Sequence, residues 1–393
     1  MLALTAPPPA AGQLPEAAAE TWTDIVAEWR RSVRDEGIVG ASLALITDGR
    51  AVDLQTEGMA DLERDLPVDD ETIYHWASIT KTFTAISIMQ LRDRGLLSLD
   101  DPIVDYVPEL RDVHNPFGSM EEITIRHLMS HSAGFRGGTW PYAGGEPWHP
   151  HEPTEWSQLV SMIPYTEIHF EPGSQYSYSN PGIIFLGRVI ERVSGDVFEA
   201  YVDKNIFRPL GMRRAYFDGT PWHLLPHRSN HYFVREGLPE PGGVDFNTGI
   251  TVSNGGLNAP VGDLVRYLAF LTNRPGSDGP SQADFEAVLD RASLEEMWEP
   301  VVPIGDNPMG DASMGLSYFL YQGDAGRIVG HTGTQRTFYS FFYIDPVSGA
   351  GVVAAFNTGA ADDTGPDTNA VRVEISARVV NELFPLLRGR GTR

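Results

Sequence analysis

Ser78 and Lys81 stand three residues apart in residues 73–86, IYHWASITKTFTAI, a run of mainly apolar and small side chains. On a helix, positions i and i+3 share one face with Cβ atoms ~5–6 Å apart, so the hydroxyl and the amine can meet. A serine is a weak nucleophile until a neighbour takes its proton. A buried lysine with a lowered pKa can take that proton, or can hold the group that does. The same spacing also arises by chance, so the rest of the chain must supply the context.

A second candidate segment is EPGSQYSYSNPG at 171–182, where Tyr178-Ser179-Asn180 comes just before the apolar run GIIFLGRVI. A tyrosinate beside a lysine ammonium could take the serine proton and later return it to a leaving group. Asn180 could bond a substrate amide. The alternative interpretation is a β-turn whose tyrosines only pack.

The third segment is GHTGTQ at 330–335, on an expected strand between two turn signals. A glycine-rich strand edge lets a substrate backbone approach closely and leaves N–H groups available for an oxyanion. His331 and Thr332 would add polar contacts. The alternative is that the glycine marks only a β-bulge.

The order of these motifs along the chain resembles that in the penicillin-recognising serine hydrolases: Ser-x-x-Lys on an early helix, Tyr-x-Asn in the middle and His-Thr-Gly on a late strand. With Tyr-x-Asn, the chain is similar to the class C β-lactamase and DD-peptidase group. That group also includes family VIII carboxylesterases, D-amino-acid amidases and related acyltransferases. The resemblance runs from about residue 20 to about residue 385 and includes GLLSLDDPIVDYVPEL, ITIRHLMSHSAGF and NGGLNAPVGDLVRYL.

The resemblance implies a serine acyl-enzyme mechanism that needs no metal and no organic cofactor. Ser78 would be the acylated nucleophile, and Lys81 and Tyr178 would be the acid/base pair. The substrate would be held by Asn180 and by the box residues His331, Thr332 and Gly333, with the backbone N–H groups of Ser78 and Thr334 forming the oxyanion hole. The acyl group would pass to water or to another acceptor.

One departure from the family pattern is His331, because the family usually has Lys-Thr-Gly where this chain has His-Thr-Gly. A lysine is charged at neutral pH, whereas a histidine near its reference pKa of ~6.5 is mostly neutral. A substrate carboxylate would therefore lose a fixed cation. This weakens a dedicated β-lactamase interpretation and leaves peptidase, amidase and esterase interpretations open, because relatives with His-Thr-Gly include DD- and D-amino peptidases. Arg336 is either a replacement cation or a solvated residue at the strand end.

Two other pairs of histidines are candidate metal ligands. His127 and His131 are four residues apart, but no glutamate follows the HExxH pattern, and the resemblance places both in a structural turn. His149 and His151 lie in the loop 136–153, which we interpret as a pocket lid. The aromatic residues of this loop either line an acyl subsite or pack on the surface; they are Trp140, Tyr142 and Trp148.

The elements that must position these residues predict a mixed α/β fold. Helical periodicity covers about 15–34, strand alternation covers 39–61, and the helix carrying Ser78 and Lys81 runs to about Arg94 before Gly95. Helical segments fill most of 100–300, strands return at about 314–356, and a last helix covers about 368–387. We expect a β-lactamase/transpeptidase-like α/β (α+β) fold, with one antiparallel sheet flanked by the terminal helices plus an all-helical insert domain.

The expected domain boundaries follow from this order of elements. Residues 1–15 form a flexible arm, 16–110 and 310–393 form a discontinuous α/β domain, and 111–309 form the helical domain. A substrate pocket is expected between the two lobes.

Composition limits the partners and the compartment. The net charge of −24 repels phosphate backbones, so nucleic acid is not an expected partner. The chain has no cysteine, which excludes thiol catalysis and disulfides. No run is long enough to span a membrane, and the start lacks the basic region of a signal peptide. We therefore expect a cytoplasmic protein, although a chain trimmed of its export signal would look the same. The sequence does not indicate an oligomeric state.

The leading functional hypothesis is a serine hydrolase, a carboxylesterase or amidase, acting on a small ester, amide or peptide. The alternatives are an acyltransferase of a biosynthetic pathway, with the loop 136–153 excluding water, and a D-amino or DD-peptidase. A third class, a catalytically silent binding scaffold, conflicts with the presence of Ser78, Lys81 and Tyr178.

Overall fold

The computed structural model describes residues 14–388 except 136, 138–141, 144–145, 148–152, 246, 278 and 324–325. The expected flexible arm lies almost entirely outside the described residues. So do Trp140, Trp148, His149 and His151 of the expected lid, and the side chain of Tyr142. Two short paired strands, β5 (Tyr142–Ala143) and β6 (Glu146–Pro147), are described within that loop.

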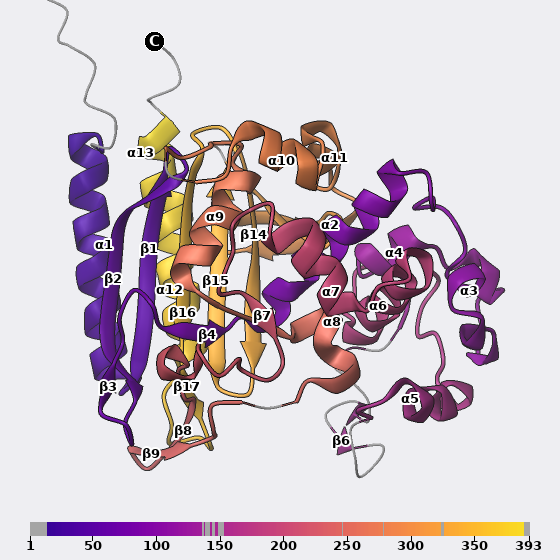
Figure 1. Cartoon of the computed structure of the whole chain (residues 1–393), viewed down its shortest axis with the longest axis horizontal. Helices are drawn as coiled ribbons and strands as arrows, with labels where there is room; N and C mark the ends of the chain where they lie inside the picture. Colours follow the sequence, from indigo (N-terminus) through magenta and orange to yellow (C-terminus); the bar gives the residue numbers. More distant parts are fainter. Residues whose placement is uncertain are drawn as a thin grey trace, which may run out of the picture.

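A nine-stranded antiparallel sheet carries the fold, in the order β11-β12-β13-β14-β15-β16-β1-β2-β3 (Figure 1). The early strands are β1 (Gly40–Thr47), β2 (Arg50–Asp61) and β3 (Leu66–Pro67). The late strands are β11 (Val302–Asn307), β12 (Gly310–Met314), β13 (Phe319–Gly323), β14 (Gly326–Gln335), β15 (Phe338–Asp345) and β16 (Ala350–Phe356). The pairing of β1 with β16, from Ala41↔Phe356 to Ile46↔Gly351, joins the two ends of the chain. The predicted fold class is therefore confirmed.

Both terminal helices cover one face of this sheet. Helix α1 (Glu16–Asp35) turns its buried stripe of Trp22, Ile25, Trp29 and Val33 toward the sheet, at the spacing of an amphipathic helix. It lies beside α12 (Thr368–Arg378), which packs on β15 (Figure 1). A π-helical turn (Val379–Leu383) and α13 (Phe384–Arg388) continue the chain, where the sequence predicted one uninterrupted helix.

The opposite face carries α9 (Val261–Leu271), which contacts β1, β2 and β16, and beyond it the remaining helices. These are α2 (Thr80–Asp93), α3 (Ile103–Tyr106), α4 (Ile125–Met129), α5 (Trp156–Met162), α6 (Asn180–Ser194), α7 (Phe198–Val202), α8 (Val252–Gly255), α10 (Gln282–Val288) and α11 (Arg291–Glu296). None of the helices in the described residues is long and apolar enough to cross a membrane.

Helix α2 is buried on all sides, although it contains several hydroxyl side chains. Thr82 and Ser87 donate hydrogen bonds to carbonyls one turn back in the same segment, and Thr84 donates to the carbonyl of Ser253 at 2.5 Å. Because buried polar groups cost free energy only when they lack partners, these bonds let a polar helix occupy the core. The core position of α2 holds Lys81 in a fixed place.

Short strands also occur in the part of the chain where sequence alternation is weak. Strands β4 (Ile73–His75), β10 (Leu257–Pro260) and β7 (Tyr216–Phe217) form one small sheet. Strands β17 (Thr358–Ala360), β8 (Tyr232–Arg235) and β9 (Leu238–Pro241) form another. Segments of two to four residues are too short to show a period of two, so the sequence did not predict them.

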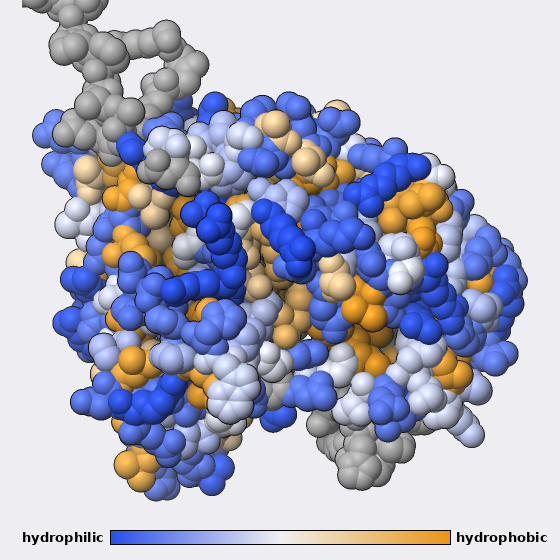
Figure 2. All heavy atoms as spheres, viewed as in Figure 1, coloured by the Kyte–Doolittle hydropathy of each residue, from blue (hydrophilic) through white to orange (hydrophobic). Residues whose placement is uncertain are grey.

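The face of the molecule shown in Figure 2 is mostly hydrophilic. Figure 2 shows hydrophilic side chains over most of the face in view, with apolar side chains gathered in smaller patches between them.

Candidate active site

Ser78 lies in a 3-10 turn, Ala77–Ile79, that leads directly into α2. Ala77 has a φ of 49°, a left-handed conformation that is uncommon for a residue other than glycine. Strained backbone of this kind clusters at functional sites, where the surrounding structure enforces it. Ser78 is a half-buried residue, unlike the fully buried Lys81.

Lys81 meets Ser78 one turn later, as the spacing predicted. Its Nζ donates to Ser78 Oγ at 2.9 Å and to the carbonyl oxygen of Asn254 in α8 at 2.8 Å. The side chain is fully buried, and burial lowers the pKa of Lys81 well below its ordinary value. A neutral amine in contact with the hydroxyl can accept its proton.

Tyr178 completes a cluster of three polar side chains. Lys81 Nζ lies 5.0 Å from the centre of the Tyr178 ring. Burial raises the pKa of Tyr178 above its ordinary value, and a hydrogen bond with Ser78 acts in the opposite direction. The phenol is therefore protonated at neutral pH, which favours Lys81 over a resting tyrosinate as the group that receives the Ser78 proton.

Strand β14 presents an open edge beside Ser78. Its pairing with β13 ends at Phe319↔Gly330, whereas its pairing with β15 continues to Gln335↔Phe338. No described strand pairs with residues 331–335 on the β13 side, and the 3-10 turn of Ser78 lies against this part of β14. An extended substrate could add its backbone to such an edge.

Gly333 is required by the close approach of that turn. A Cβ at this position would lie 2.2 Å from the carbonyl oxygen of Trp76 and 2.4 Å from Ser340 Oγ. The Ser340 hydroxyl also donates to the Trp76 carbonyl at 3.1 Å. Strands β14 and β15 therefore hold the residue two positions before Ser78.

The two expected substrate-binding side chains next to this cluster are His331 and Asn180. His331 is fully buried, and its Nδ1 donates to the carbonyl oxygen of Thr332 at 2.6 Å. Burial, and after it repulsion from Lys81 when that amine is protonated, lowers the pKa of His331 to about 3, so the imidazole is neutral at pH 7. Asn180 opens α6, and its Oδ1 is buried without a hydrogen-bond partner among the described residues.

A cation that the sequence analysis did not select lies at the same strand edge. Arg372, on α12, donates to the carbonyl oxygen of Gly333 at 3.1 Å and to Thr334 Oγ1 at 3.0 Å. Arg336, the cation that the sequence suggested, is exposed and has a left-handed φ of 55°. The one sequence signal for Arg372 is its position next to Val371, on the inward face of an expected helix.

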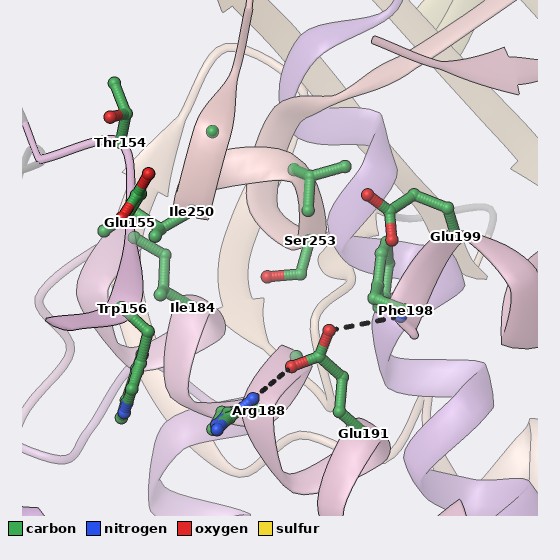
Figure 3. Close-up of a pocket in the computed structure, with 13 residues that line it drawn as sticks. Thr154, Glu155, Trp156, Ile184, Arg188, Glu191, Phe198, Glu199, Ile250 and Ser253 are labelled. Carbon is green, nitrogen blue, oxygen red and sulfur yellow. Dashed lines mark hydrogen bonds and ion pairs between the residues drawn. The ribbon is translucent and has the colours of Figure 1, made fainter. Parts of the chain in front are cut away.

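A separate cavity of about 330 Å³ lies among α5, α6, α7 and α8 (Figure 3). Glu191 and Ser253 point into it, and Glu191 accepts hydrogen bonds from Arg188 at 2.9 Å and from the backbone N–H of Phe198 at 3.4 Å. The cavity contains none of the predicted site residues. It adjoins the site through α8, where Ser253 lines the cavity and the next residue, Asn254, binds Lys81, and through α6, which begins at Asn180.

Comparison with known proteins places the chain in a family. The sequence model described as Beta-lactamase matches residues 22–376. The chain belongs to this β-lactamase family, as the order of its motifs predicted.

Two proteins with similar sequences have been given different names, an esterase and a penicillin-binding protein. Esterase EstB of Burkholderia gladioli is 27% identical over 390 residues, covering 88% of this chain and 93% of EstB. Penicillin-binding protein 4* of Bacillus subtilis is 27% identical, covering 70% of this chain but only 58% of its own length.

Solved structures agree on the fold. An octameric penicillin-binding protein homologue from Pyrococcus abyssi superposes with a TM-score of 0.72 at 29% identity, covering 92% of this chain and 76% of that one. A class C β-lactamase gives a TM-score of 0.73 at 18% identity, covering 93% of this chain and 96% of that one. The second likeness shows the fold alone.

Proposed function

We propose that this protein is a serine acyl hydrolase that cleaves a small ester or amide through an acyl-enzyme on Ser78. The observation that carries the proposal is the 2.9 Å contact between the hydroxyl of the half-buried Ser78 and the buried amine of Lys81. Family membership supports it, because the esterase EstB aligns over nearly the whole chain.

In the acylation step, Lys81 takes the Ser78 proton while Oγ bonds to the substrate acyl carbon. The backbone N–H groups of Ser78 and Thr334 stabilise the oxyanion that forms. The bond from the acyl carbon to the leaving oxygen or nitrogen then breaks, and Tyr178 donates its proton to that atom. The proton held by Lys81 returns to Tyr178, so the protons balance.

In the deacylation step, water attacks the acyl carbon and gives a proton to the Tyr178–Lys81 pair. The bond to Ser78 Oγ breaks, and the hydroxyl recovers its proton. The residues proposed to orient the substrate on the open edge of β14 are Asn180, His331, Thr332 and Gly333.

The neutral state of His331 supports a substrate without a carboxylate at this point. Its imidazole is buried and its pKa lies near 3, so it offers no fixed positive charge. The nearby Arg372 guanidinium is already engaged with Gly333 and Thr334. A neutral ester or amide therefore fits this edge better than an anionic β-lactam, in keeping with the similarity to EstB.

Turnover of three substrate classes tests the proposal: p-nitrophenyl esters, D-amino-acid p-nitroanilides and nitrocefin, each with wild type and Ser78→Ala. We expect hydrolysis of short esters or anilides by wild type, slower turnover of nitrocefin, and no turnover by the variant. Slow hydrolysis that accelerates when one amine or alcohol is added would make the protein an acyltransferase instead. Equal activity of Ser78→Ala and wild type would contradict the proposed mechanism.

A further inference from the structure

His131 contacts the backbone on both sides of Tyr178. It follows α4, is 1% exposed and has a left-handed φ of 53°. Its carbonyl oxygen accepts the N–H of Ser177 at 2.8 Å, and its ring Nδ1 accepts the N–H of Ser179 at 3.1 Å. The backbone N–H groups of the residues before and after Tyr178 are therefore both bound by His131.

The His131 ring also packs on the Tyr178 ring. Their centres lie 4.4 Å apart with an interplanar angle of 30°. The Tyr178 ring is in addition nearly parallel to Phe319, at 6.4 Å and 7°. Main-chain bonds and ring packing thus restrict both the position and the rotation of the phenol.

The contacts of His131 define its protonation state. Because Nδ1 accepts a hydrogen bond, it carries no proton, and the proton of the neutral ring must sit on Nε2. An imidazolium would place a proton on Nδ1 facing the Ser179 N–H and break that bond. The pKa of His131 lies well below its ordinary value, chiefly because of burial and then because Lys81 and His331, when protonated, would repel a proton on its ring.

We propose that His131 is a positioning residue for Tyr178, holding the phenol against Ser78 through two backbone bonds and a stacked, Nε2-protonated ring. The inference rests on the proposed function, since it assigns Tyr178 its proton-transfer role. A misplacement of about 1 Å at a reacting group can lower the rate roughly a hundredfold. Loss of the contacts between His131 and Tyr178 should therefore lower the rate of the reaction.

Two substitutions separate the contacts that His131 makes. His131→Asn keeps an acceptor near the place of Nδ1, tolerates the left-handed backbone and removes the stacked ring. His131→Phe keeps a ring but leaves the Ser179 N–H without its acceptor. In each we expect kcat for a p-nitrophenyl ester to fall about tenfold or more with KM nearly unchanged. The matched control is His127→Asn, because His127 caps the N-terminus of the same helix and touches no proposed catalytic group.

A double-mutant cycle distinguishes positioning from a general loss of stability. In a Tyr178→Phe background the phenol hydroxyl is absent, so adding His131→Asn should not lower kcat further. Nitrogen NMR of the histidine side chains in the wild-type protein should show a neutral His131 protonated on Nε2. Because this measurement needs no variant, it tests the inference even if His131→Phe does not fold. Additive losses in the cycle, full activity of both single variants, or an Nδ1-protonated His131 would each overturn the inference. Failure of wild type to turn over any ester would instead overturn the proposed function.

Discussion

Lys81 Nζ lies 2.9 Å from Ser78 Oγ and 2.8 Å from the carbonyl oxygen of Asn254, so one buried amine joins the nucleophile candidate to α8. The amine reaches this position because α2 is buried on every side, which removes water from around Lys81. Burial disfavours the charged form, so the same packing that fixes the geometry prepares the amine to accept a proton.

Replacing the amine should separate activity from stability. We expect Lys81→Met to lower ester turnover at least a hundredfold, because no base then contacts Ser78. The pKa of Lys81 is lower in the folded chain than in the unfolded chain, so the folded chain binds this proton more weakly, and burial of the amine costs stability wherever the unfolded chain is still protonated. The free energy of unfolding of Lys81→Met, measured by urea titration, should therefore be about 1 kcal/mol higher than that of wild type.

The control for this substitution is Lys204→Met, which alters an exposed lysine paired with Asp196 at 2.9 Å. It should leave turnover unchanged and stability within about 0.5 kcal/mol of wild type. A Lys81→Met variant that keeps its activity would remove Lys81 from the mechanism.

The pH dependence of acylation should follow the same group. The neutral form of Lys81 is the active one, so kcat/KM should fall as pH drops through its lowered pKa and be level above it. No further rise is expected near the ordinary lysine pKa of 10.5. A profile of kcat/KM from acid to alkaline pH checks this, and a rate still climbing through the ordinary lysine pKa would show that the amine is charged at rest.

His331 should control the preference between neutral and anionic substrates. We expect His331→Lys to raise the kcat/KM ratio of nitrocefin to p-nitrophenyl ester about tenfold, because it supplies the missing cation. His331→Gln, which stays neutral, is the control and should leave the ratio near that of wild type. Parallel kinetics on both substrates give the ratio, and identical ratios in all three proteins would contradict the assignment.

Gly333 should be required for the geometry of the turn that carries Ser78. A Cβ there would meet the Trp76 carbonyl at 2.2 Å, so Gly333→Ala should displace the turn, reduce turnover and destabilise the fold by about 2 kcal/mol. At Gly262 a Cβ would have nothing within 4 Å, which makes Gly262→Ala a matched control with unchanged turnover. Kinetics and denaturant unfolding of both variants test the contrast.

The local parts of the site could be predicted from the sequence. The contact between Ser78 and Lys81 depends on a spacing of three residues, and the order of Tyr178 and the His331 box matched a known family. The sequence placed Ser78 within a regular helix, whereas it lies in a 3-10 turn after Ala77. That turn results from contacts with β14 and Trp76, which spacing alone does not reveal.

Contacts between distant segments could not be predicted in this way. Arg372 reaches Gly333 only because α12 packs on β15, and no local pattern reports that juxtaposition. The sequence indicates a role for His131 only through its spacing from His127, because its bonds to Ser177 and Ser179 join segments more than forty residues apart. Strands β11 and β12 were not predicted either, because Gly305 interrupts the alternation of β11 and because β12, which begins at Gly310, has only five residues.

The most direct test of the acyl-enzyme is the intact mass of the protein after exposure to a fluorophosphonate, followed by peptide mapping. The account predicts one covalent adduct on wild type, located on Ser78, and none on Ser78→Ala. An unmodified wild type, or an adduct that persists in Ser78→Ala on another serine, would contradict it.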